Sequence, residues 1–433
     1  MATATVTAMA MVTSKPIRQL EMAACMTSKA FVRRLCILAV TPFILWHSVS
    51  LTAANVTREK TPEVALRLMP TDAGALAKRN DFNLLQDRNT GKWRVSADDA
   101  RQSLVAEGLN PRAVRQLAFA AENEGNVSKA QSLAYQSEKM TRRDIGTQLW
   151  LANRLASRED IKGALRHIDL GLRATPESQA LLFPMLIRAL TTSDFQAEFA
   201  RYISTSAPWL GSFINYAFSK PADLDILSRS IVLAGGLRSN AKNDVLNTQM
   251  LNLLASGGHY SEIQPYYKAR KNPDLSLLSD IALKPSGIDP RNGPLAWSAN
   301  ESVDIDAAIV TTDDGKEYSI DLTIGPGKRR AAAQKILYLQ PGTYQFSALH
   351  KFNADAADGA MNWEWACIAG SNPELLTTHI FRASDIKGGS AAQAAEVSIP
   401  ASCAIQRLTL LAVAGGGVQD TAISVRQLRI LRQ

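Results

Sequence analysis

The sequence KPSGIDPRNGP, from Lys284 to Pro294, is a dense cluster of turn-forming residues. Proline and glycine interrupt helices and strands, so such a cluster marks a structural boundary. The residues before it have apolar side chains at helical spacing, whereas those after it alternate between apolar and polar. The pattern predicts a multidomain α+β protein, in which a linker at residues 284–296 joins a helical domain at residues 60–283 to an all-β domain at residues 297–433.

The helical domain contains a repeat with a period of 34 residues. Leu117-Ala118 recurs as Leu151-Ala152, and Ala130 recurs as Ala164. A helix-turn-helix unit of this length, with small residues at the helix crossings, resembles the tetratricopeptide repeat. Ala164 and Pro176 match that repeat's second-helix alanine and terminal proline. The resemblance implies a helical solenoid, whose extended curved surface is suited to holding a peptide or a partner helix.

Turn residues mark the middle of each repeat. Gly125-Asn126 and Glu159-Asp160 lie where the two helices of a unit would turn. Three prolines, Pro184, Pro208 and Pro221, interrupt the middle of the domain. Because proline lacks a backbone N–H, we expect irregular structure there.

The all-β domain is a series of short alternating segments separated by tight turns. Many short strands in a domain of this size suit a β-sandwich, most simply a jelly roll. The expected strands are Ser302–Val310, Tyr318–Ile324, Lys335–Leu339, Thr343–His350, Asn362–Ile368, Ala395–Ile399, Gln406–Val413 and Ala422–Leu431.

An apolar stretch at residues 35–54 follows Arg33-Arg34. Roughly 20 apolar residues are enough to cross a bilayer core as a helix. The preceding tail, residues 1–34, holds five Lys or Arg and one Glu, so it carries +4 of the net charge of +8. The positive-inside rule then predicts a cytoplasmic tail, one transmembrane anchor, and a large part outside the cytoplasm. A signal segment cleaved near Thr52-Ala53-Ala54 is the alternative, and it would also export the rest of the chain.

Cysteine usage fits an exported chain. Cys25 and Cys36 lie in the tail and the apolar stretch, whereas Cys367 and Cys403 lie in the all-β domain. In an oxidising compartment such a pair predicts a disulfide.

The segment Trp363-Glu364-Trp365-Ala366-Cys367 is the candidate binding site. Strand side chains alternate between faces, so Trp363, Trp365 and Cys367 share one face and Glu364 occupies the other. Two interpretations stay open: the tryptophans pack in the core beside the disulfide, or Trp363, Glu364 and Trp365 contact a glycan. Glu364 has no second carboxylate at a recognisable spacing for glycosidase chemistry.

Other functions find no support in the residue pattern. Outside the tail the net charge is +4 (8 minus 4), too small to indicate a nucleic-acid partner. The five histidines are scattered, without the paired spacing of metal ligands. We therefore expect no catalytic residues, no metal and no cofactor.

The combination of an apolar N-terminal segment, tetratricopeptide-like repeats and a C-terminal sandwich resembles a known group. Trp365-x-Cys367 and Cys403-x-x-Gln406-x-Leu408 carry the resemblance to exported proteins of exopolysaccharide biosynthesis clusters in sphingomonad-like bacteria. It implies a non-catalytic periplasmic scaffold, tethered to the inner membrane, that binds envelope protein partners during polysaccharide assembly or export. The alternative is a carbohydrate-binding module, formed by the jelly roll and carried on a helical stalk.

Overall fold

The computed structural model describes residues 38, 40–82, 92–220, 223–313, 315–353, 359–369, 372–386, 390–416 and 419–433. The predicted tail at residues 1–34, and residues 35–37 and 39 of the predicted anchor, lie outside these ranges. The chain divides into two compact units, with the boundary in the sequence between Leu151 and Ala152.

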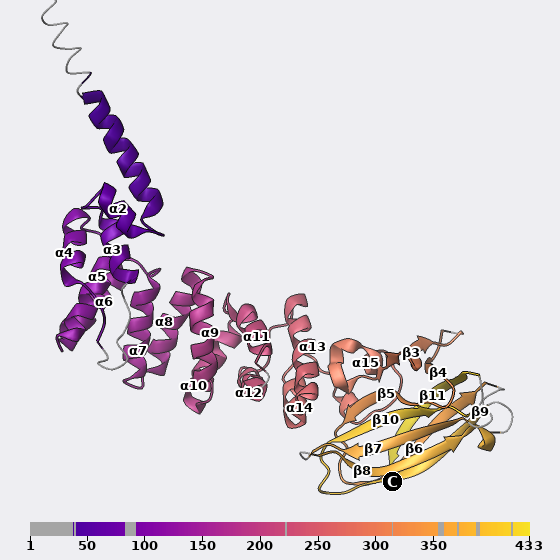
Figure 1. Ribbon diagram of the computed structural model, residues 1–433. Helices are drawn as coiled ribbons and strands as arrows, with labels where there is room; N and C mark the ends of the chain where they lie inside the picture. The colour runs from indigo at the N-terminus through magenta and orange to yellow at the C-terminus, as the bar shows by residue number, and fades with distance from the viewer. Residues whose placement is uncertain are drawn as a thin grey trace, which may run out of the picture. The chain divides into compact units, whose positions relative to one another are not determined.

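The first unit is helical (Figure 1). A helix at residues 40–57 precedes a series of packed neighbours, in which α2 contacts α3, α3 contacts α4, α4 contacts α5, and α5 contacts α6. None of the helices in the described ranges combines the length and the apolar character needed to cross a membrane. The helices are α2 (Pro62–Leu68), α3 (Ala73–Phe82), α4 (Ala97–Ala106), α5 (Pro111–Asn123), α6 (Val127–Met140) and α7 (Ile145–Ala156), the last of which runs into the second unit.

The predicted turns inside the repeats are confirmed. Gly125 and Glu159 both have positive φ angles, 77° and 63°, and each stands between two helices. The residue after each turn caps the next helix: Asn126 accepts a hydrogen bond from the Lys129 N–H, and Asp160 accepts one from the Gly163 N–H.

The helices of the second unit form two layers. In one layer α8, α10, α12 and α14 contact one another in succession, and in the other α9, α11 and α13 do so. The expected interruption at Pro184 is wrong, because this residue lies inside α9, whereas Pro208 stands in the turn before α11. Pro221 lies outside the described residues. The bounds are α8 (Ile161–Ala174), α9 (Ser178–Ala189), α10 (Ser193–Ser204), α11 (Leu210–Phe218), α12 (Leu224–Leu233), α13 (Ala241–Ser256) and α14 (Tyr260–Lys268).

The predicted linker is folded. It forms α15 (Pro285–Ile288) and the 3-10 helix η3 (Pro290–Leu295), which follow the 3-10 helix η2 (Leu275–Leu278). Segment η3 packs on α13 and on strand β5, and Leu295 is buried. The Trp297 indole donates a hydrogen bond to the Ile281 carbonyl (2.8 Å), and the Tyr338 hydroxyl donates one to the Tyr260 carbonyl (2.7 Å). These contacts join helices α8–α14 and the β domain within one compact unit.

The β domain is a sandwich of two antiparallel sheets, as predicted. The first sheet has the order β1-β5-β10-β7-β8, and the second has the order β2-β3-β4-β11-β6-β9. Figure 1 shows β5, β10, β7 and β8 side by side in one layer. The strands are β1 (Ser298–Ala299), β2 (Glu301–Ser302), β3 (Ile305–Thr311), β4 (Tyr318–Ile324), β5 (Arg329–Leu337), β6 (Gly342–Phe352), β7 (Ala360–Cys367), β8 (Glu374–Arg382), β9 (Ser390–Ile399), β10 (Gln406–Val413) and β11 (Thr421–Arg432).

The strand order is that of a jelly roll. The chain repeatedly crosses between the sheets, so that β4-β11-β6-β9 faces β5-β10-β7-β8. Inward-pointing side chains of both sheets form one core, which includes Phe346, Trp363, Trp365 and Leu408. Strand β8 and the short strands β1 and β2 are additions to the predicted set.

Candidate functional site

Both tryptophans of the predicted binding segment lie in the core of the sandwich. Trp363 and Trp365 are fully buried on the inner face of β7, and both rings contact Phe346. The Trp363 indole donates a hydrogen bond to Nε2 of His350 (2.9 Å) on the facing sheet. Of the two interpretations left open by the sequence, the structure supports packing of both tryptophans in the core. Neither ring presents a face to solvent in this structure, so neither is available to stack on a sugar.

Glu364 lies on the outer face of the same sheet, half-buried. Its Oε1 accepts a hydrogen bond from Arg329 Nη2 at 2.8 Å. Thr409 and Thr378 are its cross-strand neighbours on β10 and β8. Glu364 thus forms a surface ion pair beside two threonines, on the opposite face of β7 from the two tryptophans.

The predicted disulfide between Cys367 and Cys403 is confirmed. It connects the end of β7 to the turn before β10, with a Cα–Cα distance of 5.6 Å. Gln406 supports this turn, because its Nε2 donates to the Cys403 carbonyl (2.6 Å) and its Oε1 accepts from the Leu339 N–H (2.8 Å). The Cys403 and Gln406 positions of the recognised motif therefore have a structural role.

The outer face of the six-stranded sheet carries a shallow concavity of about 390 Å³, here named the sheet trough. Its lining includes side chains of hydrogen-bonding type and small side chains. The lining residues used below are Asp306 and Ala308 on β3, Asp321 and Thr323 on β4, Ala422 and Ser424 on β11, and Lys351 and Asn353 at the end of β6.

Strand register places the trough residues in rows across the sheet. Ala308 pairs with Asp321, Asp321 with Ser424, and Ser424 with Lys351, so one row crosses four strands. Asp306 and Thr323 belong to the next row. Because alternate side chains of a strand share a face, both rows point outward while Ile320, Leu322 and Ile423 point into the core.

The trough combines acceptors and donors. The carboxylates of Asp306 and Asp321 accept hydrogen bonds, the Lys351 ammonium donates them, and the hydroxyls of Thr323 and Ser424 do both. Asp306, Asp321 and Lys351 are exposed. Such a surface suits a ligand rich in hydroxyl groups, since each hydroxyl is both donor and acceptor.

Aromatic stacking has little part in this surface. Over β1–β11, the described aromatic side chains are buried except for Tyr318, which is half-buried. A ligand on the sandwich would therefore be held chiefly by hydrogen bonds.

A second hollow of about 280 Å³ lies between the α13–α14 hairpin and β5. Lys335 lines it and donates a hydrogen bond from its ammonium to the Leu295 carbonyl. Burial lowers the pKa of Lys335 to about 8, against the attraction of Asp280. This hydrogen bond links β5 to η3. The hollow is therefore part of the contact between the helices and the sandwich.

No group of three or more His, Cys, Asp or Glu side chains with metal-binding geometry occurs among the residues the structure describes.

No family model matches the sequence, and no curated protein matches it either. Solved carbohydrate-binding modules are similar to the sandwich. TmCBM61 in complex with beta-1,4-galactotriose is 11% identical, with 38% of this chain and 97% of that chain covered and a TM-score of 0.23. Family 16 carbohydrate-binding module-2 is 14% identical (36% and 99% covered, TM-score 0.25), and the module CBM4 is 12% identical (35% and 100% covered, TM-score 0.26). At these values the likeness concerns the fold and carries no information on what this chain binds.

Proposed function

We propose that the chain is a non-catalytic accessory protein that binds polysaccharide in the sheet trough. The row Ala308–Asp321–Ser424–Lys351 carries this proposal. This row forms an open surface across four strands, whose donors and acceptors can hydrogen-bond the hydroxyls of a sugar. Its small side chains let a sugar chain approach the sheet. The resemblance to exported proteins of exopolysaccharide clusters indicates the polymer class to examine first.

Affinity electrophoresis of the full chain, in gels that contain soluble bacterial exopolysaccharides, tests the proposal. The chain should be retarded by at least one of these polymers. Removing one charged hydrogen-bonding group should weaken binding by about tenfold or more, since such bonds contribute roughly 1.5–3 kcal/mol. Asp321→Ala and Lys351→Ala should therefore each reduce retardation.

Glu364→Gln is the matched control, because Glu364 is a carboxylate on the outer face of the opposite sheet. It should leave retardation unchanged. If Asp321→Ala and Lys351→Ala bind as the unmodified chain does, the ligand does not lie in the trough. Reducing ends that accumulate with the unmodified chain, but not with Asp321→Asn, would show a glycosidase instead.

A protein-binding role for the helices is the second candidate. The layer α9-α11-α13 exposes Leu181 and Met185, one turn apart on α9, and Val245 on α13, each between 45% and 58% exposed. An amphipathic partner could cover such side chains, as in other helical arrays. A partner that co-purifies with the unmodified chain should be lost from Leu181→Asp/Met185→Asp. It should be retained by Leu233→Asp on α12, in the other layer.

A further inference from the structure

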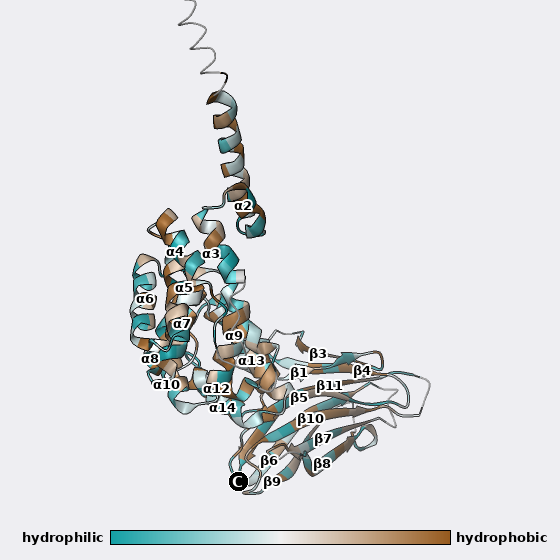
Figure 2. Cartoon of the chain, turned by 60° about the vertical axis from the view of Figure 1, so that its left-hand side comes forward, coloured by the Kyte–Doolittle hydropathy of each residue, from teal (hydrophilic) through white to brown (hydrophobic). Residues whose placement is uncertain are grey.

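The helix at residues 40–57 exposes large apolar side chains in every direction over its segment 43–46. Phe43, Ile44, Leu45 and Trp46 are 70%, 55%, 60% and 68% exposed. Successive residues of an α-helix point about 100° apart, so four in a row cover nearly every direction. Val49 and Leu51 extend this surface. Figure 2 shows the helix projecting beyond α2, with brown residues interspersed with pale and teal ones along it.

The other end of the same helix is built into the first unit. Ser50 and Ala54 are buried, and Ala54 is fully enclosed. It forms a small core with Ala65 of α2 and Ala75 of α3. Alanine side chains allow these three segments to approach closely, so a larger or missing side chain at any of them would disturb the contact.

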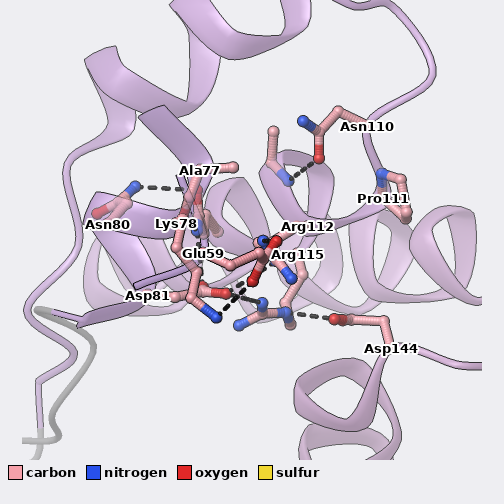
Figure 3. A network of polar contacts seen from close by, with 12 residues as sticks. Glu59, Ala77, Lys78, Asn80, Asp81, Asn110, Pro111, Arg112, Arg115 and Asp144 are labelled. Carbon is pink, nitrogen blue, oxygen red and sulfur yellow. Dashed lines mark hydrogen bonds and ion pairs between the residues drawn. The ribbon is translucent and has the colours of Figure 1, made fainter. Parts of the chain in front are cut away.

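Ion pairs fix the chain directly after the helix (Figure 3). Glu59 pairs with Lys78 of α3 (2.9 Å) and with Arg112 of α5 (3.6 Å). The hydrogen bond from Lys78 and the nearby Arg112 lower the pKa of Glu59. Arg112 and the buried Arg115 both pair with Asp81, so the network continues into the unit. The apolar helix is therefore a fixed part of this unit, and residues 58–61 do not act as a flexible tether.

The charges around the helix complement a lipid surface. Residues 35–57 contain no Asp, Glu, Lys or Arg, whereas Arg33-Arg34 precede them and Arg58 and Lys60 follow. Basic residues on both sides of an apolar segment match anionic lipid headgroups. A groove on a protein would cover one stripe of the helix, but over the segment 43–46 apolar side chains point in every direction, which fits acyl chains surrounding it.

We infer that residues 40–49 are embedded among lipid acyl chains, and that the helix is kept in the mature protein. Cleavage near Thr52-Ala53-Ala54 would remove Ala54 from its contact with Ala65 and Ala75. The inference is independent of the sheet trough, which lies in the second unit.

Flotation of the full chain with vesicles of phosphatidylcholine and phosphatidylglycerol tests the lipid contact. The chain should float with the vesicles, and Phe43→Asp/Trp46→Asp should reduce the bound fraction at least tenfold. The matched control is Val105→Asp/Leu109→Asp, the same number of changes at exposed apolar residues of the same unit, which should float like the unmodified chain. Brominated acyl chains should quench tryptophan fluorescence, and Trp46→Phe should remove that quenching.

Two results would overturn the inference. In the first, the unmodified chain does not bind the vesicles, and it forms a stable dimer in lipid-free buffer that Trp46→Asp abolishes. That result would mean that a second copy of the chain covers the helix. In the second, the intact mass of the chain extracted from cell membranes corresponds to a start near residue 55. The inference instead predicts an intact mass that includes residues 40–57.

Discussion

Acidification should weaken the C-terminal sandwich through His350. This side chain is fully buried, and its Nε2 accepts a hydrogen bond from the Trp363 indole. It must therefore be neutral in the folded chain. Burial lowers the pKa of His350 from the ordinary 6.5 to about 4. Between these values the unfolded chain binds a proton that the folded chain does not, so stability is present above pH 6.5 and is lost as the pH falls towards 4.

The size of the effect follows from the two pKa values. One pKa unit corresponds to about 1.4 kcal/mol, so the full loss is about 3 kcal/mol, of which about 2 kcal/mol falls between pH 7 and pH 5. Hydrogen exchange of peptides from β6 and β7 in the full chain measures this loss of stability within the sandwich. After correction for intrinsic exchange rates, protection should fall roughly 20- to 30-fold between these pH values.

His350→Gln is the control, because it removes the titrating ring and keeps a hydrogen-bond acceptor for Trp363. Burial also lowers the pKa of His379 on β8, whose contribution remains in the variant. The difference in the loss of protection between the unmodified chain and His350→Gln is therefore the contribution of His350. An equal fall in protection in His350→Gln and in the unmodified chain would refute this reasoning.

Two further perturbations concern the second unit. Cys367→Ser/Cys403→Ser should lower the unfolding free energy of the sandwich by about 4 kcal/mol on the chain-entropy estimate, and unchanged melting in non-reducing buffer would contradict this. Gly236→Ala should destabilise far more than Gly235→Ala, measured by thermal melting. Both residues have positive φ, but only at Gly236 would the new Cβ lie 2.0 Å from a backbone atom, the Ala269 carbonyl oxygen. Equal melting of the two variants would refute the clash.

Local sequence signals predicted much of the architecture. The turn cluster at Lys284–Pro294 separates helices from strands, and the turns at Gly125 and Glu159 lie where the 34-residue period places them. Alternation along β7 predicted that Trp363 and Trp365 share one face, and both rings are buried on the inner face. These features depend on residues that are close together in the sequence, so a single sequence is enough to predict them.

Features that depend on tertiary packing were missed. Pro184 stands inside α9, since Leu182, Phe183, Leu186 and Ile187 are buried around it and compensate for the absent N–H. Strand β8 is a sheet edge with mostly half-exposed residues, so its alternation is weak.

The candidate site could not be read from the sequence for a related reason. Asp321, Ser424 and Lys351 become neighbours only because β11 inserts between β4 and β6. Each one alone is an ordinary outward residue of a strand. Trp363 and Trp365 stood out because aromatic residues are conspicuous in a sequence, yet their bulk places them in the core.

Hydrogen exchange of the full chain, with and without a polysaccharide that retards it, tests the proposed binding site most directly. Binding in the sheet trough should slow exchange in residues 318–324 of β4, 348–353 of β6 and 421–425 of β11. Protection confined to residues 360–367 and 406–413 of the opposite sheet, or to the helices, would contradict it.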